Sequence, residues 1–257
     1  MTDNPKLEKP RQFGSAAPTV TDKLRHPSIV EAVCELRFKS GVSYSLVPGA
    51  MRERLRDTYS EFEVLPHAAM MAAIPDEAAP VVPHHRFKRT NPNLVIQTGP
   101  RLLTVNALPL YPNFEVYREE ILTALTHYKA IAEPGNPVRV GLRYINQLHG
   151  PDESPHDIGS YLRCAFSYPD GLAHPPSESA ARVLLPYQGF GSLALAVSFP
   201  SQTPQGQTAA TLDMDFYWGE GQEFDLSEFP NWLQAAHDII YKAFTTTVSE
   251  RLLRKMK

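Results

Sequence analysis

The sequence predicts an α+β fold: a mainly antiparallel sheet with helices packed on one side and a long C-terminal helix. Segments with the two-residue hydrophobic period of strands outnumber segments with a helical period. Most connections between the strand segments have the length of hairpins, and strands do not alternate with helices as they do in parallel sheets. A run of strands followed by a long helix occurs twice. We therefore expect one domain over 27–257 with two similar halves, 27–150 and 151–257.

The first elements follow a proline-containing N-terminal segment. Residues 1–26 show mixed charge and no hydrophobic period, which predicts a flexible tail. From Ser28 to Phe38 apolar and polar residues alternate, which predicts a half-buried strand. Apolar residues at helical spacing predict a helix from Val47 to Phe62, and the apolar stretch from Phe62 to Ile74 predicts one or two strands broken by a turn.

The middle of the chain predicts a hairpin and a second helix. The proline-rich residues 75–93 indicate an irregular connection with at most a short strand around Phe87. Residues 93–97 and 102–108 flank a glycine-containing turn and predict a hairpin. Asn113 is a candidate N-cap for the helix that ends before Pro134.

The elements predicted from residue 138 onward are separated by longer connections. Alternation over 138–148 predicts a strand, and 158–166 predicts a short helix. Three strands are expected over 181–185, 192–199 and 211–218. The last helix is expected to begin at Phe229-Pro230 and to continue nearly to Lys257.

Composition excludes several classes of protein. The chain has 257 residues, 42% of them hydrophobic, and a net charge of −3, so it exerts no general attraction on nucleic acid or anionic membrane. It contains no apolar run of roughly 18 residues and no signal-peptide pattern, so we expect no membrane association and a cytoplasmic location. Cys34 and Cys164 have no neighbouring ligands at zinc-site spacing, and we expect no cofactor.

Familiar catalytic motifs are absent. The sequence lacks the signatures of serine hydrolases, P-loop NTPases, dinucleotide-binding enzymes, zinc proteases and kinases. His84 and His85 are adjacent in a proline-rich segment, where neighbouring strand side chains would point apart. The other histidines, among them His237, lack carboxylates at helical spacing, so surface or capping positions are expected for them.

One strand carries a candidate metal site. Asp213 and Asp215 are two residues apart, so they face the same side of a strand and could hold a divalent cation, with Glu223 as a further ligand. The alternative is that both aspartates line the solvated face of an antiparallel strand.

A second candidate is the basic segment, residues 84–89. Arg86, Lys88 and Arg89 in a loop or edge strand could contact phosphates of a nucleic acid. Basic side chains also protect the edge of a sheet against pairing with other chains, which is the alternative interpretation.

The strand over 138–148 supplies three further binding candidates. Arg139 and Arg143 share one face of this strand, separated by about 13 Å. Asn146 lies on the opposite, mainly apolar face, where a buried amide needs hydrogen-bond partners. It therefore indicates either a structural hydrogen bond or a pocket.

Three blocks of the sequence resemble a bacterial family. These blocks are His26–Phe38, which contains the letters PSIVEAV, then Gly141–Asn146, which reads GLRYIN, and the amphipathic segment Trp232–Phe244. They are similar to a family of proteins of about this length that is sporadically distributed across bacterial genomes. The resemblance implies one integral unit but no activity, cofactor or catalytic set. Sporadic distribution is typical of mobile genes, including defence and toxin–antitoxin accessories.

Three hypotheses for function follow. The first is a non-catalytic interaction protein that binds a partner protein, encoded by a neighbouring gene, or a second copy of itself. The second is a metal-dependent phosphodiester hydrolase or nucleic-acid-binding protein that uses Asp213, Asp215 and the basic segment. The third is a small-ligand pocket between the sheet and the last helix, lined by Tyr144 and Trp232.

Overall fold

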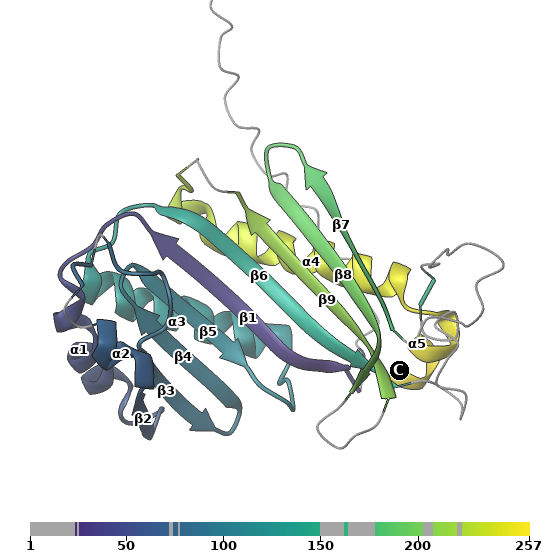
Figure 1. Ribbon diagram of the computed structural model, residues 1–257, viewed down its shortest axis with the longest axis horizontal. Helices are drawn as coiled ribbons and strands as arrows, with labels where there is room; N and C mark the ends of the chain where they lie inside the picture. The colour runs from purple at the N-terminus through teal and green to yellow at the C-terminus, as the bar shows by residue number, and fades with distance from the viewer. Residues whose placement is uncertain are drawn as a thin grey trace, which may run out of the picture.

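A single antiparallel sheet forms the centre of the computed structural model (Figure 1). The structure describes residues 24, 26–71, 74–76, 78–149, 162–163, 178–202, 208–219 and 223–257. Nine strands pair in the order β2-β3-β4-β5-β1-β6-β9-β8-β7, and every neighbouring pair is antiparallel. The strands are β1 (Ile29–Phe38), β2 (Glu61–Val64), β3 (His85–Thr90), β4 (Asn93–Gly99), β5 (Leu102–Ala107), β6 (Pro137–Leu148), β7 (Ser179–Tyr187), β8 (Gly191–Gln202) and β9 (Thr208–Trp218).

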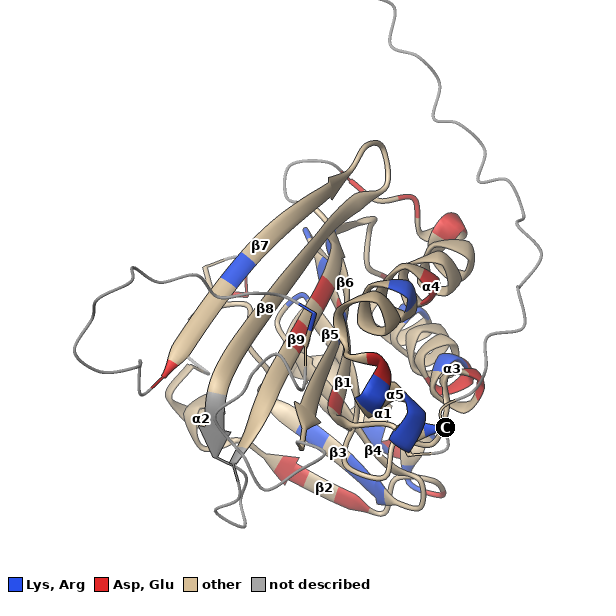
Figure 2. Ribbon diagram, turned by 90° about the vertical axis from the view of Figure 1, so that its right-hand side faces the viewer, with Lys and Arg blue, Asp and Glu red and all other residues tan. Residues whose placement is uncertain are grey.

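Helices cover one face of this sheet. Figure 2 shows the two long helices, α3 and α4, side by side on the same side of the strands. The helices are α1 (Val47–Leu55), α2 (Pro66–Met71), α3 (Phe114–Ala132), α4 (Phe229–Thr247) and α5 (Glu250–Met256). The predicted fold class is therefore confirmed. None of the described helices is long and apolar enough to span a bilayer.

The two halves of the sheet have a similar topology, but they divide before β6 and not at residue 151 as expected. In the first half β1 is followed by the β2-to-β5 meander, which returns to pair with β1 and leads into α3. In the second half β6 is followed by β7, β8 and β9, which return to pair with β6 and lead into α4. Because β1 and β6 pair with each other, the two halves share one continuous sheet.

The hydrophobic core lies between the sheet and the helices. Alternate residues of the central strands, such as Leu36 of β1 and Phe216 of β9, point toward the helices and are fully buried. Tyr117 of α3 and Trp232 of α4 meet them from the other side and are also inaccessible to solvent. This alternation leaves the opposite face of the sheet, here called the open face, to polar side chains.

The predicted limits of α3 are confirmed, because a capping residue lies at each end of this helix. Asn113 is the N-cap of α3, since its side chain accepts a hydrogen bond from the amide of Val116 at 2.8 Å. The helix ends at Glu133, which adopts the left-handed conformation directly before Pro134.

Two predicted helices are wrong in extent. The helix from Val47 ends at Leu55, and Phe62 lies in β2, with α2 following where a second strand was expected. The C-terminal helix is interrupted at Val248, which has an extended backbone and pairs with Leu162. Ser249 then caps α5 by accepting a hydrogen bond from the Leu252 amide.

Two further predictions fall largely outside the described residues. The flexible tail over 1–26 is described at residues 24 and 26 alone, and the short helix over 158–166 at residues 162 and 163 alone.

Candidate functional site

The open face of the sheet carries most of the residues that the sequence indicates as candidates. Arg139 lies at its centre and donates hydrogen bonds to Glu35 at 2.8 Å and to Asp215 at 3.0 Å. Its guanidinium also stacks over the ring of Tyr217 at 5.1 Å. A Cβ atom at residue 141 would lie 2.6 Å from this guanidinium, so a larger residue in place of Gly141 would require the arginine to shift. Arg139 is thus held by its neighbours on two strands, β1 and β9.

The second arginine of this strand pairs with the other aspartate. Arg143 forms a bidentate ion pair with Asp213, with distances of 2.7 and 2.6 Å. The carboxylate hydrogen bonds raise the pKa of Arg143. The two aspartates of the predicted metal site therefore face arginines, which compete with a cation for their oxygens.

The third predicted metal ligand lies elsewhere. Glu223 follows β9 at the end where the amide of Phe224 donates a hydrogen bond to the carbonyl of Pro137, and its carboxylate lies 3.8 Å from the ammonium group of Lys39. Asp213 pairs with residue 145, eight positions along β6 from Pro137, which is roughly 26 Å of strand. Among the described residues there is no group of three potential metal ligands. The expectation that Glu223 joins the aspartates is wrong.

The basic segment is a strand inside the sheet and not a loop. It forms β3, which pairs with β2 on one side and β4 on the other. Arg86 and Lys88 lie on the open face and both contact Glu63 of β2, at 3.4 and 2.8 Å. Arg89 points to the opposite face and binds Glu120 of α3 at 2.7 Å. The three basic residues are therefore divided between two faces and paired with carboxylates.

The two edges of the sheet differ strongly. The β2 edge has four residues, two of them glutamates. The β7 edge has nine residues, and no described strand pairs with its outer side. Its large apolar side chains are unusually exposed: Val183 49%, Leu184 50%, Leu185 43% and Tyr187 36%. Exposed residues occur on both faces of β7, because neither helix reaches it. An edge that is long, flat and apolar is a template for pairing with another chain.

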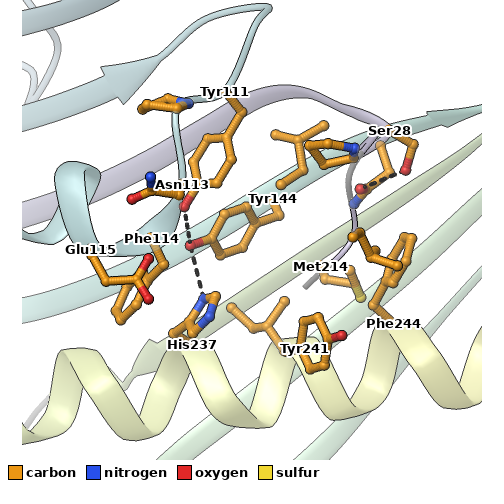
Figure 3. A pocket seen from close by; sticks show the side chains of 16 residues that line it. Ser28, Tyr111, Asn113, Phe114, Glu115, Tyr144, Met214, His237, Tyr241 and Phe244 are labelled. Atoms are coloured by element: carbon orange, nitrogen blue, oxygen red, sulfur yellow. Dashed lines mark hydrogen bonds between the residues drawn. The ribbon is translucent and has the colours of Figure 1, made fainter. Parts of the chain in front are cut away.

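The helix-covered face contains a cavity of about 240 Å³ (Figure 3). It lies where the N-terminal end of α3 approaches α4, above β6. Tyr144 of β6 occupies the centre, with its hydroxyl 3.2 Å from that of Tyr111 and 3.2 Å from Nδ1 of His237. The imidazole of His237 stacks on Phe114 at a ring distance of 3.7 Å.

Burial keeps the polar groups of this cavity neutral. It lowers the pKa of His237 to about 4, although the charge of Glu115 acts in the opposite direction. Burial also raises the pKa of the hydroxyls of Tyr111 and Tyr144 above their ordinary value. The cavity thus disfavours charge of either sign. The expectation that His237 is a surface or capping histidine is wrong, because α4 turns this residue toward β6.

Two other sequence-based candidates are resolved at the same cavity. Asn146 is 2% exposed, accepts a hydrogen bond from the Ser28 hydroxyl at 3.0 Å and donates to the carbonyl of Leu212. It has both of the roles anticipated for it, because it also lines the cavity. Tyr144 lines the cavity as expected, whereas Trp232 does not and is packed in the core instead.

A second cavity, of about 870 Å³, lies beside α1, α2 and the start of β3. His84 and His85 both line it, because His84 precedes the strand and is not bound by strand alternation. Tyr44 lies between them and has its hydroxyl 2.8 Å from Nδ1 of His85. Nε2 of His84 is buried without a hydrogen-bond partner among the described residues.

No protein-family model matches the chain, and no curated protein was found to be similar to it in sequence. The interpretation of these sites therefore depends on their own geometry.

Proposed function

We propose that this protein is a non-catalytic interaction protein that binds an extended segment of a partner protein along the free edge of β7. The observation that carries the proposal is the exposure of this nine-residue strand, whose apolar side chains Val183, Leu184 and Leu185 are about half accessible. Added strands gain affinity from main-chain hydrogen bonds and specificity from alternate side chains. An edge strand with apolar groups on both faces provides both.

The opposite edge supports this assignment by contrast. Short length and acidic side chains, as in β2, are the means by which proteins prevent pairing at a sheet edge. Such protection is weak in β7, where Arg182 is the one charged side chain in the strand. A proline, Pro186, removes one backbone donor near its end, and alternate amides of the remaining residues are directed toward β8, so the others face the free edge.

The open face supports a non-catalytic role. Its acidic residues Asp213 and Asp215 are engaged by arginines at hydrogen-bond distance, and so are less available to act as metal ligands or bases. The resemblance to a sporadically distributed family leads us to propose further that the partner is encoded by a neighbouring gene of a mobile defence or toxin–antitoxin locus.

Site-specific photocrosslinking tests the proposal. The photoreactive residue p-benzoylphenylalanine is placed at Leu184 on β7. The matched control position is Leu110, which is 92% exposed and follows β5, with four strands between β5 and β7 in the sheet. Both forms are expressed in the native host and irradiated. We expect a discrete crosslinked protein from position 184 and not from position 110.

A blocking variant completes the test. Val183→Lys with Leu185→Lys places charges at the same edge, at positions exposed enough to tolerate them. We expect the crosslink at 184 to disappear while the thermal unfolding temperature stays near that of the wild type. Equal crosslinking from both positions, or crosslinks between copies of this chain alone, would contradict the proposal.

A further inference from the structure

We propose that the cavity between α3 and α4 is a binding site for a small uncharged molecule that carries one ring and a hydroxyl or amide group. This site is independent of the β7 edge, because its walls come from β1, β6, β9, the two long helices and the segments directly before β1 and α3. It would give the protein a ligand-binding function in addition to partner binding.

The walls define the body of the ligand. Ile29, Met214, Ile240 and Phe244 contribute apolar surface, and Phe114 contributes an aromatic ring near the α3 end. Natural ligand pockets usually have volumes of about 300–1,000 Å³. At about 240 Å³ this cavity suits a molecule with a single ring.

Two polar groups lie on different sides of the cavity. In Figure 3 the side chains of Tyr111, Tyr144 and His237 point toward one another on one side, and Ser28 lies on the other. Tyr111, Tyr144 and His237 form a chain of hydrogen bonds, in which the hydroxyl and imidazole groups can exchange donor and acceptor roles. This adaptable chain can accept a hydrogen bond from a ligand or donate one to it. The Ser28–Asn146 hydrogen bond is a second polar contact point at the far wall.

The charge of the ligand follows from the groups already in the cavity. None of the sixteen described residues that line it is a lysine or an arginine, so an anion finds no ion-pair partner there. Burial disfavours the anionic form of Tyr111 and Tyr144, and it also disfavours the cationic form of His237, whose pKa falls to about 4. A charged ligand would meet the same desolvation penalty. Glu115 is the one charged residue among the described residues that line the cavity, and it is exposed, so solvent screens its attraction for a cation.

Three probes that share a ring and differ in the charge of their polar group test this inference. Benzyl alcohol, benzylamine and benzoate share one ring and are neutral, cationic and anionic at pH 7. The full-length protein is labelled with ¹³C in its methionine methyl groups, and the methyl spectrum is recorded while each probe is added. Met214 lines the cavity, whereas Met51 belongs to α1, is equally buried and serves as the internal control.

We expect benzyl alcohol to shift the Met214 methyl signal, with an affinity on the order of millimolar for so small a molecule. The Met51 signal stays in place. Benzylamine and benzoate bind at least about tenfold more weakly, because their charge must be desolvated when they enter the cavity. The inference is overturned if no probe moves Met214, if Met51 moves with it, or if either charged probe binds as well as benzyl alcohol.

A variant locates the polar contact. His237→Phe keeps the ring stacked on Phe114 and removes the imidazole from the hydrogen-bonded chain. Binding of benzyl alcohol should weaken about three- to tenfold, the effect of one hydrogen bond. Tyr128→Phe changes a buried tyrosine at the other end of α3, outside the cavity, and should leave binding unchanged. Equal binding by the wild type and His237→Phe would remove His237 from the site.

Discussion

The two faces of the sheet are stabilised by different interactions, although their residues alternate along the same strands. On the helix-covered face, buried apolar side chains pack against α3 and α4, and even the histidine of the cavity is kept neutral. On the open face, charged side chains from β1, β6 and β9 meet in ion pairs, among them Arg139 with Glu35 and Asp215.

This difference has a consequence for how each face responds to change. Packing and burial are insensitive to salt but strongly sensitive to lost volume. Ion pairs that remain partly exposed contribute little each and respond to salt and pH. The comparison therefore predicts a steep gradient of effects from the helix-covered face to the open face.

The largest effect is expected at the centre of the helix-covered face. Trp232 is fully buried among Phe216, Phe224 and Phe229, and its indole donates to the carbonyl of Phe190 at 3.3 Å. Trp232→Ala should lower the free energy of unfolding by about 3–5 kcal/mol, since it removes a large side chain and leaves a cavity. Urea denaturation with an unchanged m-value measures this loss. A loss under about 1 kcal/mol would show that packing on this face is not dominant.

The second effect is a pH dependence that arises from His237. Its pKa is about 4 in the folded protein and 6.5 in the unfolded chain, so the unfolded chain binds the proton more tightly. Stability is therefore complete above pH 6.5 and falls as the pH drops from 6.5 to about 4, by up to about 3 kcal/mol.

His237→Phe isolates this contribution. Glu115, Tyr144 and Tyr241 border the histidine and remain in the variant. Wild type and variant are compared by urea denaturation at pH 7 and at pH 4.5. We expect the wild type to lose more stability between the two values than the variant. Equal losses would mean that the pKa of His237 is the same in the folded protein and in the unfolded chain.

Trp232 and His237 also show how much of the fold can be predicted from the sequence. The hydrophobic period of 229–247 places Trp232 on the buried side of a helix. Asn113 and Pro134 mark the limits of α3. Both can be predicted, because hydrophobic periods and helix caps depend on residues that are near one another in the chain. The burial of His237 depends on where α4 crosses β6, which no local period specifies.

The candidate sites on the open face show the same limit. Alternation alone places Asp213 with Asp215, and Arg139 with Arg143, on common faces. Which arginine meets which carboxylate depends on the strand order β1-β6-β9 and on its register, and a shift of one residue would reverse every contact. The sequence therefore indicates the residues of the ion pairs and not their pairing. Strand β7 carries one signal that it lies at an edge, Pro186, but this residue falls outside the strand predicted over 181–185.

A smaller loss of stability is expected at the least exposed ion pairs of the open face. Arg139, Glu35 and Asp215 have side chains that are 17%, 19% and 25% exposed. Arg139→Met keeps the apolar stem but leaves Asp215 without its hydrogen-bonded cation and Glu35 with Arg37 alone, which should lower the free energy of unfolding by about 1–3 kcal/mol.

The dependence of this loss on Asp215 serves as the control. Burial already raises the pKa of Asp215, and Arg139 acts against that rise. Removing Arg139 should raise this pKa further, so the loss shrinks as the pH falls and the carboxyl groups become protonated. It should also be smaller in an Asp215→Asn background, which a double-mutant cycle by urea denaturation measures. Independent effects of the two substitutions would contradict the ion-pair network.

The smallest effect is expected at the other arginine of β6. Arg143 is 44% exposed and pairs with a single carboxylate, Asp213, so solvent competes for both partners even though the pair is bidentate. Arg143→Met should change the free energy of unfolding by less than about 1 kcal/mol, and 1 M salt should reduce this difference further through screening. Chemical denaturation at low and high salt provides the measurement. A loss as large as that of Arg139→Met would mean that exposure does not govern the strength of these pairs, and the gradient between the two faces would then have to be explained by hydrogen-bond geometry.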